Sequence, residues 1–590
     1  MRSFFHRRKA EAQPASADEL LVEQLQERKA QVLPWIESPV KAHDGDLTFH
    51  LRHEANSVEL FFDLFFVANL ATFTAYHAIV DIDALLAYIG LFGIIWATWF
   101  QVTLHDVRFA IDSVYERACK VIQFMVMIGF ALVGSAFAPG GKKQNNKNFK
   151  ILCWLLFTSR ALLAIQYIAV LVFSLQKTKK LVLPIVLNTA SFVLAAGAFI
   201  AMTPAFAAAT GDGWTIYYVW YIVLFAESAA VIGVSSIWRT LSFKKTHLVE
   251  RMGLLTLIVI GEGAIGVTKT VGKLMGKGIN FEGCALVLCI ILILVFLWML
   301  YFDNHPHGHY GTVREQLWAC LHFPLHLAIV GVVEGSQQIA LARYVFKNID
   351  QFRADIYIAC AEQRLEGKML VDALTKAVDN FQLDKKVESQ AQVAVIKKSI
   401  TALGAQAGIC SGATVSTFDT RKDVIPGFGN VMRDLIGGLF QANGAKLPNG
   451  TEPAELAINS FTTVYIYFWC SVLVVIACFL SFIWLTRHHG RRTDIFDRFA
   501  IGGRTTMLLL STAFIVLFRQ QDFMYYFIEN GSLLPAFVGM LFTIVCCDRL
   551  GRLQSAKALK KYVGLGEIEM QSSDRDSKEQ VAVASHEVHH

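Results

Sequence analysis

Long, nearly uncharged runs of about 20 apolar residues recur along this 590-residue chain, with short polar breaks between them. A run of this length is what an α-helix needs to cross the hydrocarbon core of a bilayer. Hydrophobic residues make up 54% of the chain and charged residues only 17%, whereas ordinary soluble domains carry about 25% charged residues. The pattern predicts an all-α, polytopic transmembrane helix bundle and argues against a soluble globular protein.

About twelve runs are long enough to be membrane helices. We expect them near residues 57–80, 85–104, 117–138, 151–174, 181–203, 214–236, 251–271, 280–302, 316–334, 459–486, 503–520 and 527–547. Similar short sequences occur at Trp96–Phe100 and Trp298–Phe302, and again at Ala118-Cys119 and Ala319-Cys320. This similarity suggests a six-plus-six helix repeat, an arrangement found in transporters that bind their substrates between the repeats.

The loops between the predicted helices indicate an orientation. Lys and Arg are more frequent in the short loops on the side of the N-terminus, which predicts that both termini are cytoplasmic. Both N-x-[ST] sequons, at Asn449 and Asn530, then fall outside as glycosylation sites. Cys360 and Cys410 could form a disulfide if their long loop is extracytoplasmic, and this pairing is left open. We expect an integral membrane protein of the plasma membrane, with an endomembrane as the alternative.

These features divide the chain into five parts. We expect a cytoplasmic N-terminal segment at 1–56, a membrane domain of helices 1–9 at 57–342, an extracytoplasmic helical soluble insertion at 343–458, helices 10–12 at 459–547, and a cytoplasmic, largely disordered tail at 548–590.

Ionisable residues inside the predicted helices are the candidates for function, because each costs roughly 2.5–3.5 kcal/mol at a helix centre on insertion scales. One interpretation is a transport, proton or ion pathway. Another is that Arg160 neutralises a glutamate while the histidines bond across helices, and a metal site is a third. The residues concerned are Asp63, Glu59, Glu227, Glu262, His322, His326 and Arg160.

The first predicted helix begins with two acids one helical turn apart, Glu59 and Asp63. Two carboxylates at this spacing repel each other, so both stay ionised only if a cation or a basic side chain lies near them. Glu59 is explained as an interfacial group that complements the helix N-terminus. Asp63 lies deeper, among phenylalanines, and requires a proton, an ion or a side chain that neutralises it.

Four stretches carry a resemblance to a known family, namely VELFFDLFFV (58–67), HLVERMGLLTLIVIGEG (247–263), WMLYFD (298–303) and CLHFPLHLAIVGVVEG (320–335). They resemble the low temperature requirement A (LtrA) family over roughly residues 52–340, and the resemblance plausibly resumes at 459–547. It implies a multi-helix membrane protein and supplies no activity. By motif match it highlights Glu59, Asp63, His247, Glu250, Arg251, Gly261 and Glu262.

Three of these residues, His247, Glu250 and Arg251, form an H-x-x-E-R cluster at the start of the seventh predicted helix. We expect them to act as a gating latch, in which Arg251 pairs with Glu59 or Asp63 and ties helix 7 to helix 1.

The loop DNHPHGHYG places Asp303, His305, His307 and His309 close together. Imidazole and carboxylate groups suit a transition metal such as zinc or nickel. A solvated loop broken by glycine and proline is the alternative. No other cofactor is predicted.

The function that the residues favour is a secondary transporter or channel for a small ion or solute, proton-linked through the intramembrane acids and histidines. An intramembrane metal-dependent enzyme and a structural or sensory scaffold are the alternatives. The chain has no G-x-S-x-G motif, which weakens the enzyme hypothesis. The expected partners are the lipid bilayer and the transported ion or solute, with self-association left open and no nucleic acid.

Overall fold

Long helices dominate the fold. In the computed structural model, the residues described are 33–43, 46–49, 55–76, 82–139, 145–177, 179–206, 215–243, 246–275, 280–306, 310–385, 389–411, 427–442, 453–487, 494–517, 526 and 530–586. Within them, eleven helices are long and apolar enough to cross a bilayer. A further apolar helix of 20 residues is α2 (Ser57–Tyr76). The prediction of a polytopic helical bundle is confirmed.

The membrane helices form two bodies of six. The first body contains α2, α3 (Ile82–Phe109), α4 (Val114–Gly134), α5 (Asn146–Lys177), α6 (Val182–Ala201) and α7 (Tyr218–Ile237). The second contains α8 (Leu248–Leu274), α9 (Phe281–Phe302), α11 (His322–Tyr357), α16 (Pro453–Thr486), α17 (Ile495–Leu517) and α19 (Leu533–His586).

Shorter elements connect these helices. The connecting elements are an antiparallel pair of strands, β1 (Val40–His43) and β2 (Asp46–Phe49), the 3-10 turns η1 (Lys179–Leu181), η2 (Thr203–Phe206), η3 (Thr215–Tyr217) and η4 (Arg239–Leu241), and the short helix α10 (Thr312–Cys320).

Both bodies pack their helices in the same order. In the first, α2 contacts α3 and α4, α4 contacts α5, α5 contacts α6, α6 contacts α7, and α7 returns to α3. In the second, α8 contacts α9 and α11, α11 contacts α16, α16 contacts α17, α17 contacts α19, and α19 returns to α9. Each body is therefore a closed ring with the same connectivity, the arrangement that a six-plus-six parallel repeat produces.

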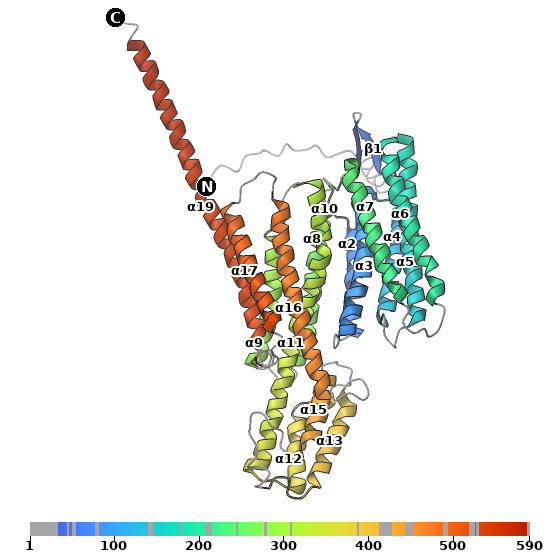
Figure 1. The fold of residues 1–590 in the computed structure, drawn as a ribbon, viewed down its shortest axis with the longest axis vertical. Helices are drawn as coiled ribbons and strands as arrows, with labels where there is room; N and C mark the ends of the chain where they lie inside the picture. Colours follow the sequence, from blue (N-terminus) through green and yellow to red (C-terminus); the bar gives the residue numbers. More distant parts are fainter. Residues whose placement is uncertain are drawn as a thin grey trace, which may run out of the picture.

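The two bodies meet along α2 and α3 of the first and α8 and α11 of the second, and α7 also touches α10. Figure 1 shows the first body in blue to green and the second in green to red, lying side by side. Aromatic side chains of α2 and α3 fill part of the core behind this contact, including Phe62, Phe66 and Trp99, each fully buried.

Local capping fixes where several helices begin. The Ser113 hydroxyl accepts a hydrogen bond from the Glu116 amide at 3.2 Å at the start of α4. The Asn280 side chain does the same for the Gly283 amide at 2.6 Å at the start of α9. Side-chain oxygens at these positions satisfy amides that the first helical turn leaves without partners.

A helical insertion lies between α11 and α16. Its elements are the π-turn η5 (Ile358–Glu362), α12 (Gly367–Asp379), η6 (Leu383–Lys385), α13 (Gln390–Gly404) and α15 (Gly429–Ala442). A disulfide joins Cys360 in η5 to Cys410 after α13. In Figure 1 the insertion occupies the end of the molecule opposite the β1–β2 pair and the extended end of α19.

Two helices continue past their predicted ends. The apolar run of α11 was expected to end at residue 334, but the helix extends to Tyr357 and carries the chain into the insertion. The tail at 548–590 is expected to be largely disordered, and in the structure α19 continues through its described part to His586. The segment 551–586 has no proline and many good helix formers, so the helix can extend after the apolar run stops.

Candidate functional site

Asp63 lies at the contact between the two bodies and is clamped by a basic residue of the other body. Arg251 of α8 donates to both of its carboxylate oxygens, at 2.9 and 2.8 Å. The Trp99 indole of α3 adds a third hydrogen bond at 2.7 Å. The Asp63 and Arg251 side chains are both 0% exposed. A two-pronged contact of this kind matches the planar guanidinium to the carboxylate, so a side chain neutralises Asp63 in this structure.

Glu59 is bonded to the same helix of the second body. The His247 imidazole lies 3.1 Å from one of its carboxylate oxygens, and both side chains are buried. One turn along α8, Glu250 accepts a hydrogen bond at 3.4 Å from the Ala55 amide, which precedes α2. We refer to Glu59, Asp63, His247, Glu250 and Arg251 as the α2–α8 latch, which joins the bodies at the end where both helices begin.

Arg160 and Glu227 form a second buried ion pair, inside the first body. The Arg160 guanidinium of α5 donates to Glu227 of α7 at 2.5 and 3.1 Å, and it donates to the Thr98 hydroxyl at 2.8 Å. Both side chains of the ion pair are nearly inaccessible. This contact ties α5 to α7 and does not cross between the bodies.

The two histidines of α11 have partners at all four ring nitrogens. His322 Nδ1 lies 2.9 Å from the Trp318 carbonyl, and its Nε2 lies 2.8 Å from the Tyr301 hydroxyl. His326 Nδ1 accepts from the Trp96 indole at 3.2 Å, and its Nε2 lies 2.8 Å from the Thr256 hydroxyl.

These partners assign one proton to each ring. His322 carries it on Nδ1, facing a carbonyl, and His326 carries it on Nε2, because the other nitrogen accepts from an indole. Both rings are thus accommodated in the neutral form. Trp96 belongs to α3 and Thr256 to α8, so His326 also links the two bodies.

Glu262 and Glu334 are different from the other intramembrane acids. Glu262 of α8 is half-buried, and its Oε2 has no hydrogen-bond partner among the described residues. Among the described residues, Glu334 of α11 accepts a hydrogen bond from Gln338 alone, at 2.9 Å. Glu262 interacts electrostatically with Glu334 and Lys269, and Glu334 interacts with Lys273 and Lys269, yet no basic group of the described residues is within ion-pair distance of either carboxylate. We call them the Glu262–Glu334 pair.

Two tyrosines, Tyr467 and Tyr88, link the Glu262–Glu334 pair electrostatically to the first body. Tyr467 of α16 is buried, its hydroxyl has no hydrogen-bond partner in the described part of the chain, and it interacts electrostatically with Glu334. Tyr467 also interacts with Tyr88 of α3, across the contact between the bodies. The acidic pair therefore lies close to the interface, and its two residues occupy later turns of α8 and α11 than the latch and the histidines.

The predicted metal site is only partly described. Asp303 and His305 lie beside a cavity of about 390 Å³ that also borders Arg487, Asp497 and Arg552. His307 and His309 lie outside the described residues. Within the described ranges, no group of three or more His, Cys, Asp or Glu residues could hold a metal ion.

Of the two predicted glycosylation sites, Asn449 is outside the described residues. Asn530 is exposed in a turn before α19, where its side-chain amide donates to the Tyr526 carbonyl at 2.8 Å.

Two further buried ion pairs were missed by the sequence analysis. Lys120 of α4 bonds Asp106 of α3, and Arg504 of α17 donates to Asp548 of α19 at 2.6 and 2.9 Å. Both acids lie just beyond a predicted apolar run, Asp106 in an expected loop and Asp548 at the start of the expected tail. Helix-forming sequence that continues past each apolar run was the signal that could have placed them in helices.

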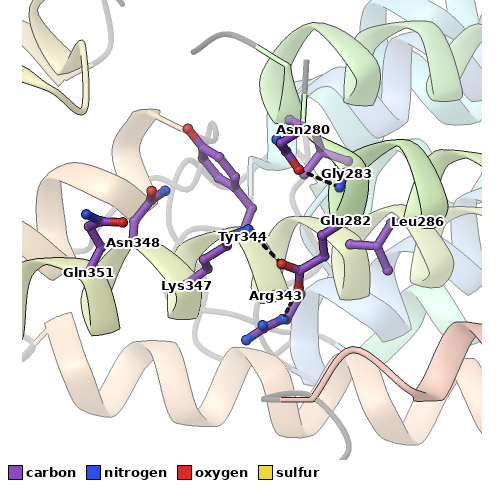
Figure 2. Close-up of a pocket in the computed structure, with 10 residues that line it drawn as sticks. Asn280, Glu282, Gly283, Leu286, Arg343, Tyr344, Lys347, Asn348 and Gln351 are labelled. Carbon is purple, nitrogen blue, oxygen red and sulfur yellow. Dashed lines mark hydrogen bonds and ion pairs between the residues drawn. The ribbon is translucent and has the colours of Figure 1, made fainter. Parts of the chain in front are cut away.

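A pocket of about 230 Å³ lies where α9 begins and α11 leaves the bundle. Figure 2 shows Glu282 between two bases of α11, with Arg343 and Lys347 donating to its carboxylate at 2.5 and 2.7 Å. Because α9 and α11 both belong to the second body, this contact does not join the two bodies.

Fold and site together define a polytopic α-helical integral membrane protein whose two six-helix bodies are joined through buried polar contacts. Residues 54–354, just over half of the chain, match the family described as Bacterial low temperature requirement A protein (LtrA), and the chain belongs to this family. The matched region contains the latch, the α11 histidines and the Glu262–Glu334 pair. No curated protein and no solved structure matches the chain.

Proposed function

We propose that this protein is a secondary transporter for a small cation or cationic solute, and that the Glu262–Glu334 pair is its proton- or ion-coupling site. The observation that carries the proposal is the contrast along one interface. At the latch, each acid of α2 has a basic or imidazole partner from α8, whereas the Glu262–Glu334 pair has no ion-pair partner among the described residues. Intramembrane acids without such a partner are expected where protons or cations bind.

The arrangement of the bodies supports a rocking motion. Transporters built from parallel repeats bind near the repeat interface and move one repeat against the other. Among the described residues, the ion pairs that cross the interface belong to the latch, and they lie at one end of it. A bound proton or cation reduces the repulsion between Glu262 and Glu334 and so changes the packing of α8 and α11, the two helices of the second body that contact α2 and α3 of the first body.

The location of the protein is part of the same proposal. We place it in the plasma membrane with the latch end toward the cytoplasm, as the Lys and Arg bias of the short loops favours. The insertion then faces the exterior, where a disulfide such as Cys360–Cys410 persists and where Asn449 and Asn530 could carry glycans.

A flux assay tests the proposal. Purified protein in liposomes is given a pH gradient and a panel of small cations and cationic solutes, and internal pH and solute are followed. We expect coupled proton movement that Glu262→Gln and Glu334→Gln each reduce at least tenfold. The matched control is Glu282→Gln, which changes an acid of the second body that is paired with Arg343 and Lys347. We expect this variant to retain flux. If no proton or solute moves in wild-type liposomes, or if the two variants match wild type, the proposal is wrong.

A structural scaffold is the second candidate, and one observation favours it. Asp63, Glu227 and Asp548 are each clamped by an arginine, as expected when charges only lock a bundle. A scaffold predicts that Glu262→Gln and Glu334→Gln change thermal stability while every flux stays at the level of empty liposomes.

A further inference from the structure

A cluster of charged side chains lies inside the first body, apart from the Glu262–Glu334 pair. His105 and Asp106 of α3 are 0% and 2% exposed, and they face Glu116 and Lys120 of α4. Lys120 bonds one oxygen of Asp106. These four residues, which we call the His105 cluster, lie at the same end of the bundle as the latch.

Hydrogen bonds in the His105 cluster are incomplete. His105 Nδ1 lies 3.5 Å from the second oxygen of Asp106 without forming a hydrogen bond. Four buried atoms have no hydrogen-bond partner within the described part of the chain. They are both ring nitrogens of His105, Oδ1 of Asp106 and Oε1 of nearby Gln123. Buried polar atoms are satisfied in more than about 90% of cases, so several unsatisfied atoms in one place indicate bound water or a bound ion.

The charges of the cluster do not balance. Asp106 and Glu116 contribute two negative charges, and Lys120 contributes one positive charge. Glu116 accepts a hydrogen bond from Gln166 at 3.0 Å, which is a neutral partner. Arg108 of α3 is also buried, but its guanidinium donates to the Tyr167 and Ser235 hydroxyls and the Leu241 carbonyl and to neither acid. With both acids ionised, the four residues of the cluster therefore carry one surplus negative charge in a site enclosed by membrane helices, where a charge is costly. His105, which interacts electrostatically with both Asp106 and Glu116, is the group placed to offset it.

Other titratable and charged groups face the cluster from the surrounding helices. On α5, Tyr167 packs edge-on against the His105 ring at 5.3 Å and bonds Arg108 of α3. On α4, Cys119 interacts with Glu116, and on α2, Glu59 of the latch interacts with Asp106. The cluster and the latch are thus electrostatically linked through Glu59.

We propose that the His105 cluster is a proton-binding site that takes up one proton from the latch side of the membrane. A hydronium ion gives its proton to an imidazole nitrogen of His105 and leaves as water. The imidazolium is then held between Asp106 and Glu116, and the cluster becomes neutral. Loss of that proton restores the negative charge of the cluster, which interacts electrostatically with Glu59 of the latch through Asp106.

Infrared difference spectroscopy on the full chain in lipid vesicles tests this site without any transport assay. Spectra are taken between about pH 5 and pH 8, the range in which histidine titrates. We expect His105→Gln to remove one imidazole-to-imidazolium component from the wild-type difference spectrum. His326→Gln, whose ring nitrogens are both bonded, is the matched control and leaves the spectrum unchanged. Identical difference spectra for wild type and His105→Gln would overturn the proposal.

A second variant tests the proposal independently, in case His105→Gln does not fold. Glu116→Gln keeps the shape of the cluster and removes its surplus negative charge, so we expect the imidazolium component to appear only at lower pH than in wild type. An unchanged titration in Glu116→Gln contradicts the proposal. A further experiment varies the sodium concentration at constant pH. An infrared component that follows the sodium concentration would show that the site binds a metal cation and not a proton, and it would overturn the proposal.

The result is independent of the proposed transport function. Vesicles that show no flux but lose the imidazole component in His105→Gln retain the proton site and reject the transporter. Flux that depends on the Glu262–Glu334 pair, without a His105 component in the spectrum, would support the transporter and reject the proton site.

Discussion

The guanidinium of Arg251 in α8 donates two hydrogen bonds, of 2.9 and 2.8 Å, to the carboxylate of Asp63 in α2. The pair crosses from one six-helix body to the other, and neither side chain is accessible. Because the paired charges compensate each other only while they stay together, this contact sets the stability of the interface and resists its opening.

Removing one partner of this pair should be costly. Arg251→Met leaves the Asp63 charge buried without compensation, and we expect a loss of about 3–5 kcal/mol in the free energy of unfolding. The double variant Asp63→Leu/Arg251→Met removes both charges and should recover most of this loss. Thermal unfolding in a mild detergent measures the difference. A double variant that is no more stable than Arg251→Met contradicts the assignment.

The Arg160–Glu227 pair should act independently of the latch. It lies within the first body and, among the described residues, shares no hydrogen-bond partner with Asp63 or Arg251. Combining Arg160→Met with Arg251→Met should therefore give losses that add within about 0.5 kcal/mol. A coupling larger than about 1 kcal/mol in this double-mutant cycle would show that the two pairs form one network.

The bond from Trp96 to His326 should contribute to the contact between the bodies. Trp96→Phe keeps an aromatic ring in the core and leaves Nδ1 of His326 without its donor. We expect a cost of about 1–3 kcal/mol, the penalty for a buried group without a partner. Trp154→Phe, at an exposed position of α5, is the control and should change stability little. Equal effects of the two variants would count against the assignment.

The disulfide of the insertion should stabilise that part locally. Cys360 and Cys410 are 50 residues apart, and closing a loop of this length is worth about 4 kcal/mol in the chain-entropy account. We expect Cys360→Ser/Cys410→Ser to make the insertion sensitive to limited proteolysis, while the membrane bundle stays intact. Cleavage sites that spread into α8 or α9 would show that the insertion supports the bundle as well.

Most of the fold could be predicted because each membrane helix is a long apolar run. The latch contacts could also be predicted, because Glu59 and Asp63 are acidic, Arg251 is basic, and all three lie at the same level of the membrane. The choice between Glu59 and Asp63 as the partner of Arg251 was not, because it depends on how α2 and α8 are rotated against each other. Only packing fixes that rotation.

Other parts of the site could not be read from the residues alone. Asp106 and Asp548 lie in helices that extend beyond their apolar runs, whereas the apolar runs alone predict a loop at Asp106 and a tail at Asp548. The tautomers of His322 and His326 depend on Trp96, Tyr301 and Thr256, which come from three other helices. Glu334 lies within the stretch CLHFPLHLAIVGVVEG, yet its nearness to Glu262 follows only from the packing of α8 against α11.

The central claim is that the two bodies move against each other by opening the latch, and a distance measurement tests it most directly. Spin labels are placed at Ser57 at the start of α2 and at Val313 in α10, the short helix that leads into α11 of the second body. Both positions are exposed at the latch end, and the exposed Cys284 and Cys470 are first replaced by serine. Pulsed electron paramagnetic resonance in lipid vesicles should give two distances in wild type, with the longer one enriched in Asp63→Asn. A single distance that is the same in wild type and in Asp63→Asn would contradict the claim.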